Sequence, residues 1–213
     1  MNEQRRDDLT VTLKDKAIQA VRSGDTERAV ELIEELNSTT RNVHDRYCEY
    51  VSILLTYVAR AFGEEKVKDA AEFLVNNVHK RVLLGPLKNA EHEKVVGATA
   101  RTHCNHWSEF FVEEDDEKTV ITLTCCGSGG RMMKEGKYEN TDRHPLMGGI
   151  TKKAYPWSFD RAGLPYYCVH CAIYNLLWPE WDLGFRRVLE YGRQFDDDGN
   201  PVDEPCRVVI YKD

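Results

Sequence analysis

The 213-residue sequence predicts an α+β protein, in which a helical bundle at residues 1–102 precedes a smaller domain with an antiparallel sheet at residues 103–213. Two observations predict this division. Apolar residues recur every three or four positions through the first hundred residues, which is the spacing of amphipathic helices. After Trp107 the pattern changes to short β-rich runs separated by turn residues, as in an antiparallel sheet.

The helices of the first part are predicted from their apolar stripes and from the residues that end them. Asp25 is the expected N-cap of one helix. A longer helix is expected from about 41 to 62, and a third from about 64 to 84, where Gly85-Pro86 interrupts the chain. Residues 87–102 are expected to be helical too. We expect this bundle either to pack on the second part or to form a homodimer.

The second part is expected to begin with a hairpin. Residues 109–113 and 119–124 are β-rich and are joined by an acidic turn. Two helices are expected from about 167 to 178 and from about 181 to 191. Residues 207–211 then predict a closing strand.

Residues 127–163 are the least periodic stretch of the chain and contain seven glycines. Irregular segments of this length are uncommon inside compact domains, and they often cover a binding site. The Gly127-Ser-Gly-Gly start allows backbone amides to approach a ligand closely. We therefore expect this segment to cover a site.

Charge and hydropathy exclude several classes of partner. The net charge is −7 and the basic residues are scattered among acids, so no nucleic-acid surface is expected. No apolar stretch approaches the roughly 20 residues that span a bilayer, so no membrane partner is expected. The N-terminal residues lack the apolar core of a signal peptide, which predicts a cytoplasmic protein with reduced thiols.

A pair of cysteines at CxxC spacing suggests a metal site. Cys168 and Cys171 bracket His170, and such pairs supply two ligands to a soft metal at once. If Cys168 starts a helix, the helix N-terminus should lower the pKa of its thiol. Two alternatives stay open: the thiols are ordinary buried side chains, or they form a redox pair, although the thioredoxin-like strand and helix are missing.

The third expected ligand is Cys126, at the end of the second strand and beside the glycine-rich turn. Cys125 would face the opposite side of that strand, so only one of the two should bind the metal. We expect zinc, or alternatively iron, bound by Cys126, Cys168 and Cys171, with His170 or His106 as a fourth ligand or as an acid–base partner. The metal ligands would thus come from segments about forty residues apart.

Three histidines are candidates for acid–base catalysis. His170 lies between the paired cysteines and is the first candidate. His106, three residues after His103, is the second, because this spacing places both side chains on one face of a helix end. His144 on the long loop is the third. Surface histidines without a function are an equally good reading of His103, His106 and His144.

The segment from Pro165 to Tyr211 resembles the end of the L-2-amino-thiazoline-4-carboxylic acid hydrolase-like family and of the vinyl-4-reductase sensor domains. The resemblance is carried by Pro-Tyr-Tyr-Cys-Val-His-Cys at 165–171, the helix that follows, and Glu-Pro-Cys-Arg-Val-Val-Ile-Tyr at 204–211. It implies an α+β fold with zinc held by cysteines beside an apolar pocket for a small molecule. It also implies Cys206 as a further metal or pocket residue. The Cys-Cys-Gly-Ser-Gly-Gly run at 125–130 departs from both families.

Two functions follow as expectations. The first is a zinc-dependent enzyme, most simply a hydrolase of a small organic molecule, because three protein ligands leave an open position for water. The alternative is a small-molecule-binding or sensor protein whose zinc is structural and closed by four ligands. An open coordination position favours the enzyme, and a complete set of four protein ligands favours the sensor.

Overall fold

The computed structural model describes residues 10–212, and its internal contacts divide the chain into two compact units, Met1–Arg46 and Tyr47–Asp213. Helices of residues 47–102 therefore share a unit with the sheet. Mixed helix with a small antiparallel sheet confirms the α+β class. Within residues 10–212, no helix is long and apolar enough to cross a membrane.

The first unit is built on helix α1, Leu13–Ser23, and the beginning of α2, Thr26–Phe62. The side chain of Thr12 caps α1 by accepting from the Asp15 amide at 3.1 Å. Gly24 ends this helix in the left-handed conformation. Ala17, Ala20, Ala29 and Leu32 form its small core.

One prediction for these helices is wrong. The helix after Asp25 and the helix expected at 41–62 are a single element, α2. The residues between the two predicted stripes, Asn37 to Thr40, are weak helix formers but include neither glycine nor proline. A weak local preference is insufficient to end a helix whose flanks are strongly helical.

The second unit continues with α3, Glu65–Leu74, a π-helical segment at Val75–Leu84, and α4, His92–Asn105. The predicted helix at 64–84 is therefore confirmed in extent but changes its winding at Val75. π-Helical turns are rare and displace side chains relative to an α-helix, often at functional sites. This change affects His79, which lies within the segment.

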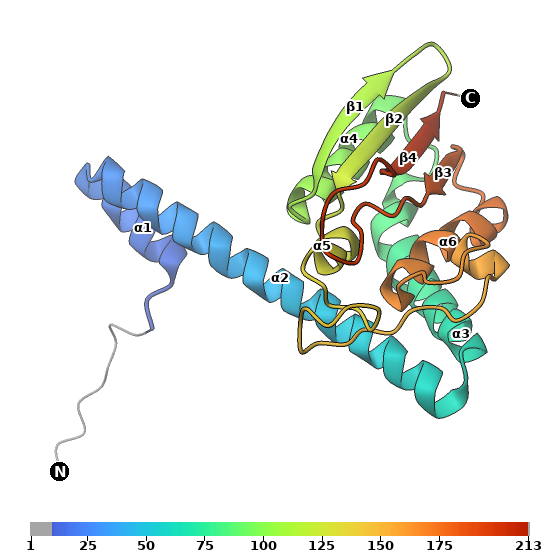
Figure 1. Cartoon of the computed structure of the whole chain (residues 1–213). Helices are drawn as coiled ribbons and strands as arrows, with labels where there is room; N and C mark the ends of the chain where they lie inside the picture. The colour runs from blue at the N-terminus through green and yellow to red at the C-terminus, as the bar shows by residue number, and fades with distance from the viewer. Residues whose placement is uncertain (1–9, 213) are drawn as a thin grey trace. The chain divides into compact units, whose positions relative to one another are not determined.

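A four-stranded antiparallel sheet forms the other half of this unit, in the order β1-β2-β4-β3 (Figure 1). The strands are β1, Glu109–Glu114; β2, Lys118–Cys125; β3, Arg187–Glu190; and β4, Cys206–Tyr211. Leu123 pairs with Cys206 across β2 and β4, which places the end of β2 beside the start of β4.

Helix α6, Val169–Leu177, confirms the helix predicted at 167–178, whereas the helix predicted at 181–191 is wrong. Asp182 and Gly184 both have positive φ, which interrupts helical winding. The chain then enters β3, where Val188 pairs with Val209 of β4. An edge strand of four residues carries too little periodicity to be found from sequence.

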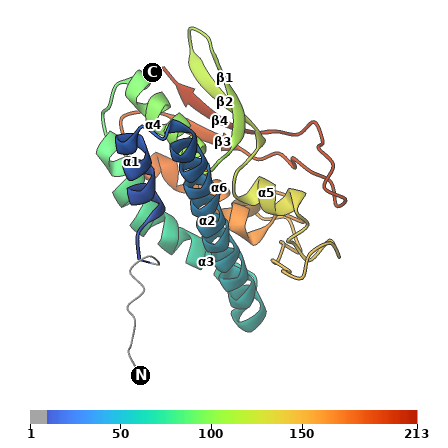
Figure 2. The same ribbon diagram turned by 90° about the vertical axis from the view of Figure 1, so that its left-hand side faces the viewer.

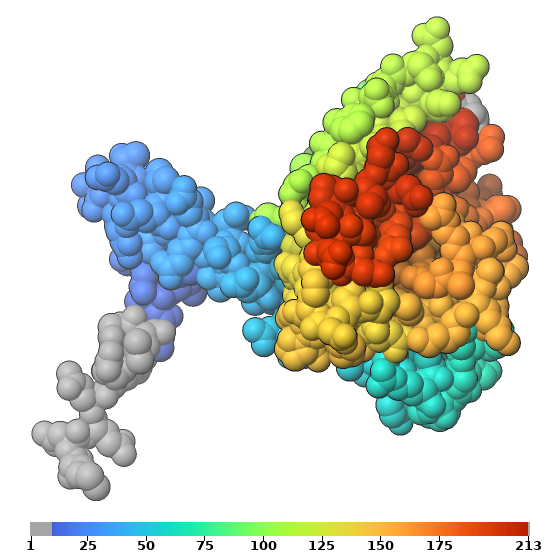
Figure 3. All heavy atoms as spheres, viewed as in Figure 1, coloured from blue at the N-terminus to red at the C-terminus, as the bar shows by residue number. Residues whose placement is uncertain are grey.

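The predicted covering segment at 127–163 is more ordered than expected, because it contains the short helix α5, Gly129–Lys134. The Arg131 amide donates to the carbonyl of Cys126 at 2.8 Å, so this helix starts directly at the end of β2. The segment forms a continuous part of one molecular face, yellow to orange in Figure 3.

The main core lies between the sheet and the helices of the second unit. Ile121 and Ile210 of the sheet are fully buried, as are Val67 of α3 and Val95 of α4. Both ribbon views place α4 beside the sheet, where the ring of His92 bonds to Thr119 at 2.8 Å (Figure 2). This packing fixes the ends of β2, β4 and α6 relative to one another.

Candidate functional site

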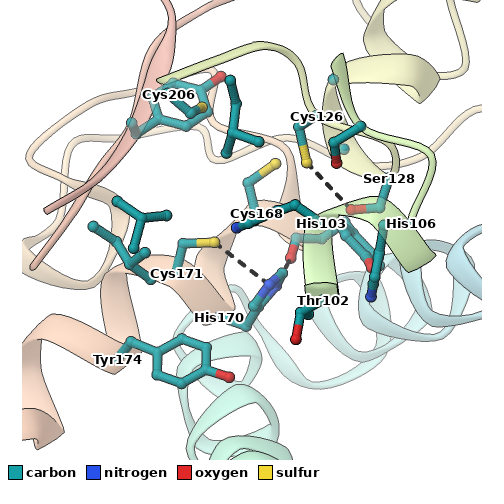
Figure 4. A pocket seen from close by; sticks show the side chains of 18 of the residues that line it. Thr102, His103, His106, Cys126, Ser128, Cys168, His170, Cys171, Tyr174 and Cys206 are labelled. Atoms are coloured by element: carbon teal, nitrogen blue, oxygen red, sulfur yellow. Dashed lines mark hydrogen bonds between the residues drawn. The ribbon is translucent and has the colours of Figure 1, made fainter. Parts of the chain in front are cut away.

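A cavity of about 310 Å³ lies inside the second unit, where the ends of β2 and β4 meet the first turn of α6 (Figure 4). The π-helical segment, the end of α4, and α5 complete its wall. Four of the chain's seven cysteines line it: Cys126, Cys168, Cys171 and Cys206. These thiols come from three segments that are about forty residues apart in sequence.

Cys126 is positioned by the backbone that follows β2. Its amide donates to the Gln194 side chain at 2.9 Å, and its Sγ lies 3.4 Å from the Ser128 hydroxyl. A Cβ at Gly127 would lie only 1.7 Å from the carbonyl oxygen of His106, so glycine is required there. Cys125 is buried and does not line the cavity, in keeping with the alternation expected for a strand.

Cys168 and Cys171 lie at the start of α6. Cys168 is the residue before the helix, and its Sγ faces Gly129, where an added Cβ would approach to 2.5 Å. The Cys171 Sγ lies 3.4 Å from Nε2 of His170. Both thiols point into the cavity seen in Figure 4, with Cys168 between Cys126 and Cys171 in that view.

The protonation of the His170 ring follows from its partners. Its Nδ1 contacts the carbonyl oxygen of Tyr167, which only accepts, so Nδ1 carries the proton in the neutral ring. Nε2 is then the acceptor and faces the Cys171 thiol. A backbone carbonyl that holds Nδ1–H in this way is the common arrangement behind a histidine that binds a metal through Nε2.

Cys206, the first residue of β4, completes the group of thiols. Its Sγ lies 3.3 Å from the amide nitrogen of Gly192 and 3.4 Å from the carbonyl of the same residue. The sulfur therefore has local backbone partners as well as the cavity. Of the remaining cysteines, Cys104 is exposed and lies outside the cavity lining.

Burial keeps the thiols of Cys168, Cys171 and Cys206 protonated at neutral pH. Burial raises the pKa of Cys171 and that of Cys206 to about 12. Burial, followed by the neighbouring cysteines Cys171, Cys126 and Cys206, raises the pKa of Cys168 well above its usual range. The expectation that the helix N-terminus lowers the pKa of Cys168 is therefore wrong, because desolvation of the thiolate outweighs the helix dipole.

Histidines line the opposite side of the cavity. Burial, with smaller contributions from His170 and Arg187, lowers the pKa of His79 to about 3. Burial and Arg187 lower the pKa of His103 to about 4. Both rings are thus neutral at physiological pH. His106 also lines the cavity, so the predicted i, i+3 pair of α4 meets the cysteines there.

His144 does not join this group. Its Nδ1 accepts from the Leu146 amide at 2.9 Å, and the residue is outside the cavity lining. Its catalytic role stays a prediction from sequence alone.

Three residues of the cavity were missed by sequence reasoning: His79, Arg187 and Gln194. Gln194 is 2% exposed and bonds to Cys126 and Leu123 through its side-chain amide. Each of the three comes from a segment without a motif. Only the long-range packing of the second unit identifies them.

The cavity thiols are close without forming a finished coordination shell. Within residues 10–212, no group of three or more His, Cys, Asp and Glu side chains is arranged so as to hold a metal ion. The zinc site expected from sequence is therefore an inference from donor chemistry and from the shared cavity. Formation of such a site would require side-chain movement.

Comparison with known proteins adds no family: no family model, curated protein or solved structure matches this chain. The resemblance of residues 165–211 to two families stays a prediction.

Proposed function

We propose that the cavity binds a small organic molecule beside a zinc ion held by Cys126, Cys168 and Cys171, and that the protein hydrolyses this molecule. The observation that supports the proposal is the gathering of four cysteines from three distant segments around one cavity. Thiolates are strong zinc ligands, and a cavity of about 310 Å³ is at the lower end of small-molecule sites.

The donor chemistry fits zinc better than iron. Four sulfur donors, or three sulfur donors with one imidazole, are typical of zinc sites. The thiols of Cys168 and Cys171 are protonated without metal, so zinc binding would displace their protons, and the thiolates so formed would be drawn together around the ion. His170 is oriented to act as a fourth ligand or as a base, because its Nε2 carries the lone pair of the neutral ring and faces the Cys171 thiol.

The enzymatic role depends on an open ligand position. When bound by three protein ligands, zinc supplies a water molecule of lowered pKa. His106 and His170 line the same cavity and are the residues proposed to move the proton between water and the leaving group. Their roles require the organic ligand to lie between the thiols and the end of α4.

Cys206 supports the alternative, a binding or sensor protein with a structural zinc. It lines the same cavity and would close the site as a fourth sulfur ligand. The two functions differ in the response of the Cys206→Ser variant. A catalytic site with three cysteines should keep zinc in this variant, whereas a closed site of four cysteines should lose most of its zinc affinity.

The experiment that tests the function compares zinc-loaded and chelator-treated protein on a panel of small cyclic amides and esters. We expect hydrolysis only with zinc, and we expect the Cys206→Ser variant to retain it. Zinc binding without turnover, together with loss of zinc in Cys206→Ser, would replace the hydrolase by the sensor function. Turnover that persists after removal of zinc would refute the metal-dependent mechanism.

We also propose that α2 binds a second copy of this chain. Tyr47, Tyr50, Leu54 and Tyr57 are each 58–65% exposed and follow the 3-4-3 spacing of a coiled-coil seam. In sequence the repeat extends back through the exposed residues Val43, Leu36 and Ile33. The exposed row from Tyr47 to Tyr57 lies within the second unit and is the part of the repeat on which the proposed interface is based.

Self-association is tested by Leu54→Glu, because a carboxylate in an apolar seam would lack a partner. We expect a dimer for the wild type and a monomer for this variant in sedimentation equilibrium at micromolar concentrations. Phe73→Glu is the control, because Phe73 of α3 is 73% exposed and lies outside the repeat. A monomeric wild type, or equal dissociation of both variants, would contradict the proposed seam.

A further inference from the structure

Arg187, the first residue of β3, places a guanidinium at the wall of the cavity. Its charged carbon lies 5.6 Å from the centre of the Tyr174 ring and 5.9 Å from that of Trp178. Its Nε is buried and has no hydrogen-bond partner within residues 10–212. The guanidinium thus has aromatic neighbours but no acceptor for this donor.

The cavity lining does contain a carboxylate, but this carboxylate is paired with an arginine other than Arg187. Glu190 is the one carboxylate among the residues that line the cavity, and its side chain lies 3.7 Å from Arg207. Both of these side chains are about half exposed. In the described part of the chain, Arg187 forms no ion pair with any carboxylate. Its charge is therefore uncompensated by a protein anion.

The neighbours of the guanidinium are aromatic, and Glu190 is the single carboxylate among the described residues that line the cavity. Burial of a cation without a partner is costly unless an anion arrives with the ligand. An arginine fork matches a carboxylate in plane and can form two parallel hydrogen bonds with it.

We propose that Arg187 is the recognition point for the anionic group of the cavity's ligand, an organic oxyanion for which a carboxylate is the best geometric match. The apolar part of this ligand would lie against Tyr174 and Leu189, which line the same cavity. This inference rests on the proposed binding function and adds the charge of the substrate to it.

The test uses benzoate and its neutral counterpart benzamide, which share shape and size, as probes of the full-length zinc-loaded protein. Isothermal titration should show benzoate binding at least tenfold more tightly than benzamide. Arg187→Gln should abolish this preference, and Arg187→Lys should retain only part of it, because a lysine keeps the charge without the fork. Arg186→Gln is the matched control and should keep the full preference, because Arg186 lies outside the cavity lining and its guanidinium carbon lies 4.1 Å from the centre of the Tyr211 ring.

The outcomes separate this inference from the proposed function. Equal binding of both probes by the wild type, or an unchanged preference in Arg187→Gln, would overturn the role of Arg187 while the cavity remained a ligand site. Binding of neither probe up to millimolar concentration would count against both the role of Arg187 and the proposed ligand site. Lower zinc affinity in Arg187→Gln with an unchanged preference for benzoate would assign Arg187 to the thiolates instead. Circular dichroism establishes that each variant is folded.

Discussion

Cys168→Ser and Cys168→Ala should each reduce the zinc content of the purified protein from about one ion per chain to almost none. The thiol of Cys168 interacts with each of the other cavity thiols, since Cys171, Cys126 and Cys206 all raise its pKa. Loss of a residue that only orients a metal ligand by a hydrogen bond lowers the affinity for the metal about 10–100-fold. Loss of the ligand itself should therefore lower the zinc affinity by about a hundredfold or more. Elemental analysis and chelator competition measure both quantities.

The control for this prediction is Cys104→Ser. Cys104 is an exposed cysteine of α4 that lies outside the cavity lining, so its replacement should leave zinc content and affinity unchanged. Two cysteine variants at position 168 separate packing from ligation, because serine introduces a buried hydroxyl and alanine does not. Retention of a full zinc equivalent by both folded variants would show that Cys168 is not a ligand.

The second large effect concerns stability in acid. The pKa of His79 is about 3 and that of His103 is about 4 in the folded protein, against an ordinary value of 6.5. Below pH 6.5 the unfolded chain binds protons that the folded protein excludes, so stability is fully present above this pH and falls as the solution is acidified. Between pH 8 and 5 the loss is about 2 kcal/mol for each of these two histidines.

Urea unfolding between pH 8 and 5, with a chelator present throughout, measures this loss without a contribution from metal release. His79→Phe should remove the share that belongs to His79 and leave that of His103 and of His170, whose pKa is also lowered by burial. Phenylalanine cannot be protonated and keeps the stacking on Tyr174, whose ring centre lies 5.1 Å from that of His79. The same variant also removes a buried nitrogen that has no hydrogen-bond partner. A pH dependence identical to that of the wild type would show that His79 is protonated in the folded state.

The cysteine half of the site was predictable because its signals are local. The CxxC spacing places Cys168 and Cys171 on one turn, and strand alternation separates Cys126 from Cys125. These relations depend on residues within four positions of one another. The structure then brings Cys126 and the pair to a single cavity, which a glycine-rich turn and a short helix allow.

The other half of the site was beyond sequence reasoning. Arg187 was assigned to a helix, and it lies in an edge strand that exists only because Val188 and Leu189 pair with β4. His79 belongs to a segment whose π-helical winding has no signature in the sequence. The thiol pKa values were misjudged for the same reason, because burial depends on the whole packed unit.

X-ray absorption at the zinc edge of the reconstituted wild-type protein tests the proposed zinc site, because it reports which atoms bind the metal. We expect three or four sulfur neighbours at about 2.3 Å, with any remaining position filled by nitrogen or oxygen at about 2.0–2.1 Å. A shell made of nitrogen and oxygen alone, or a protein that takes up no zinc, would contradict it.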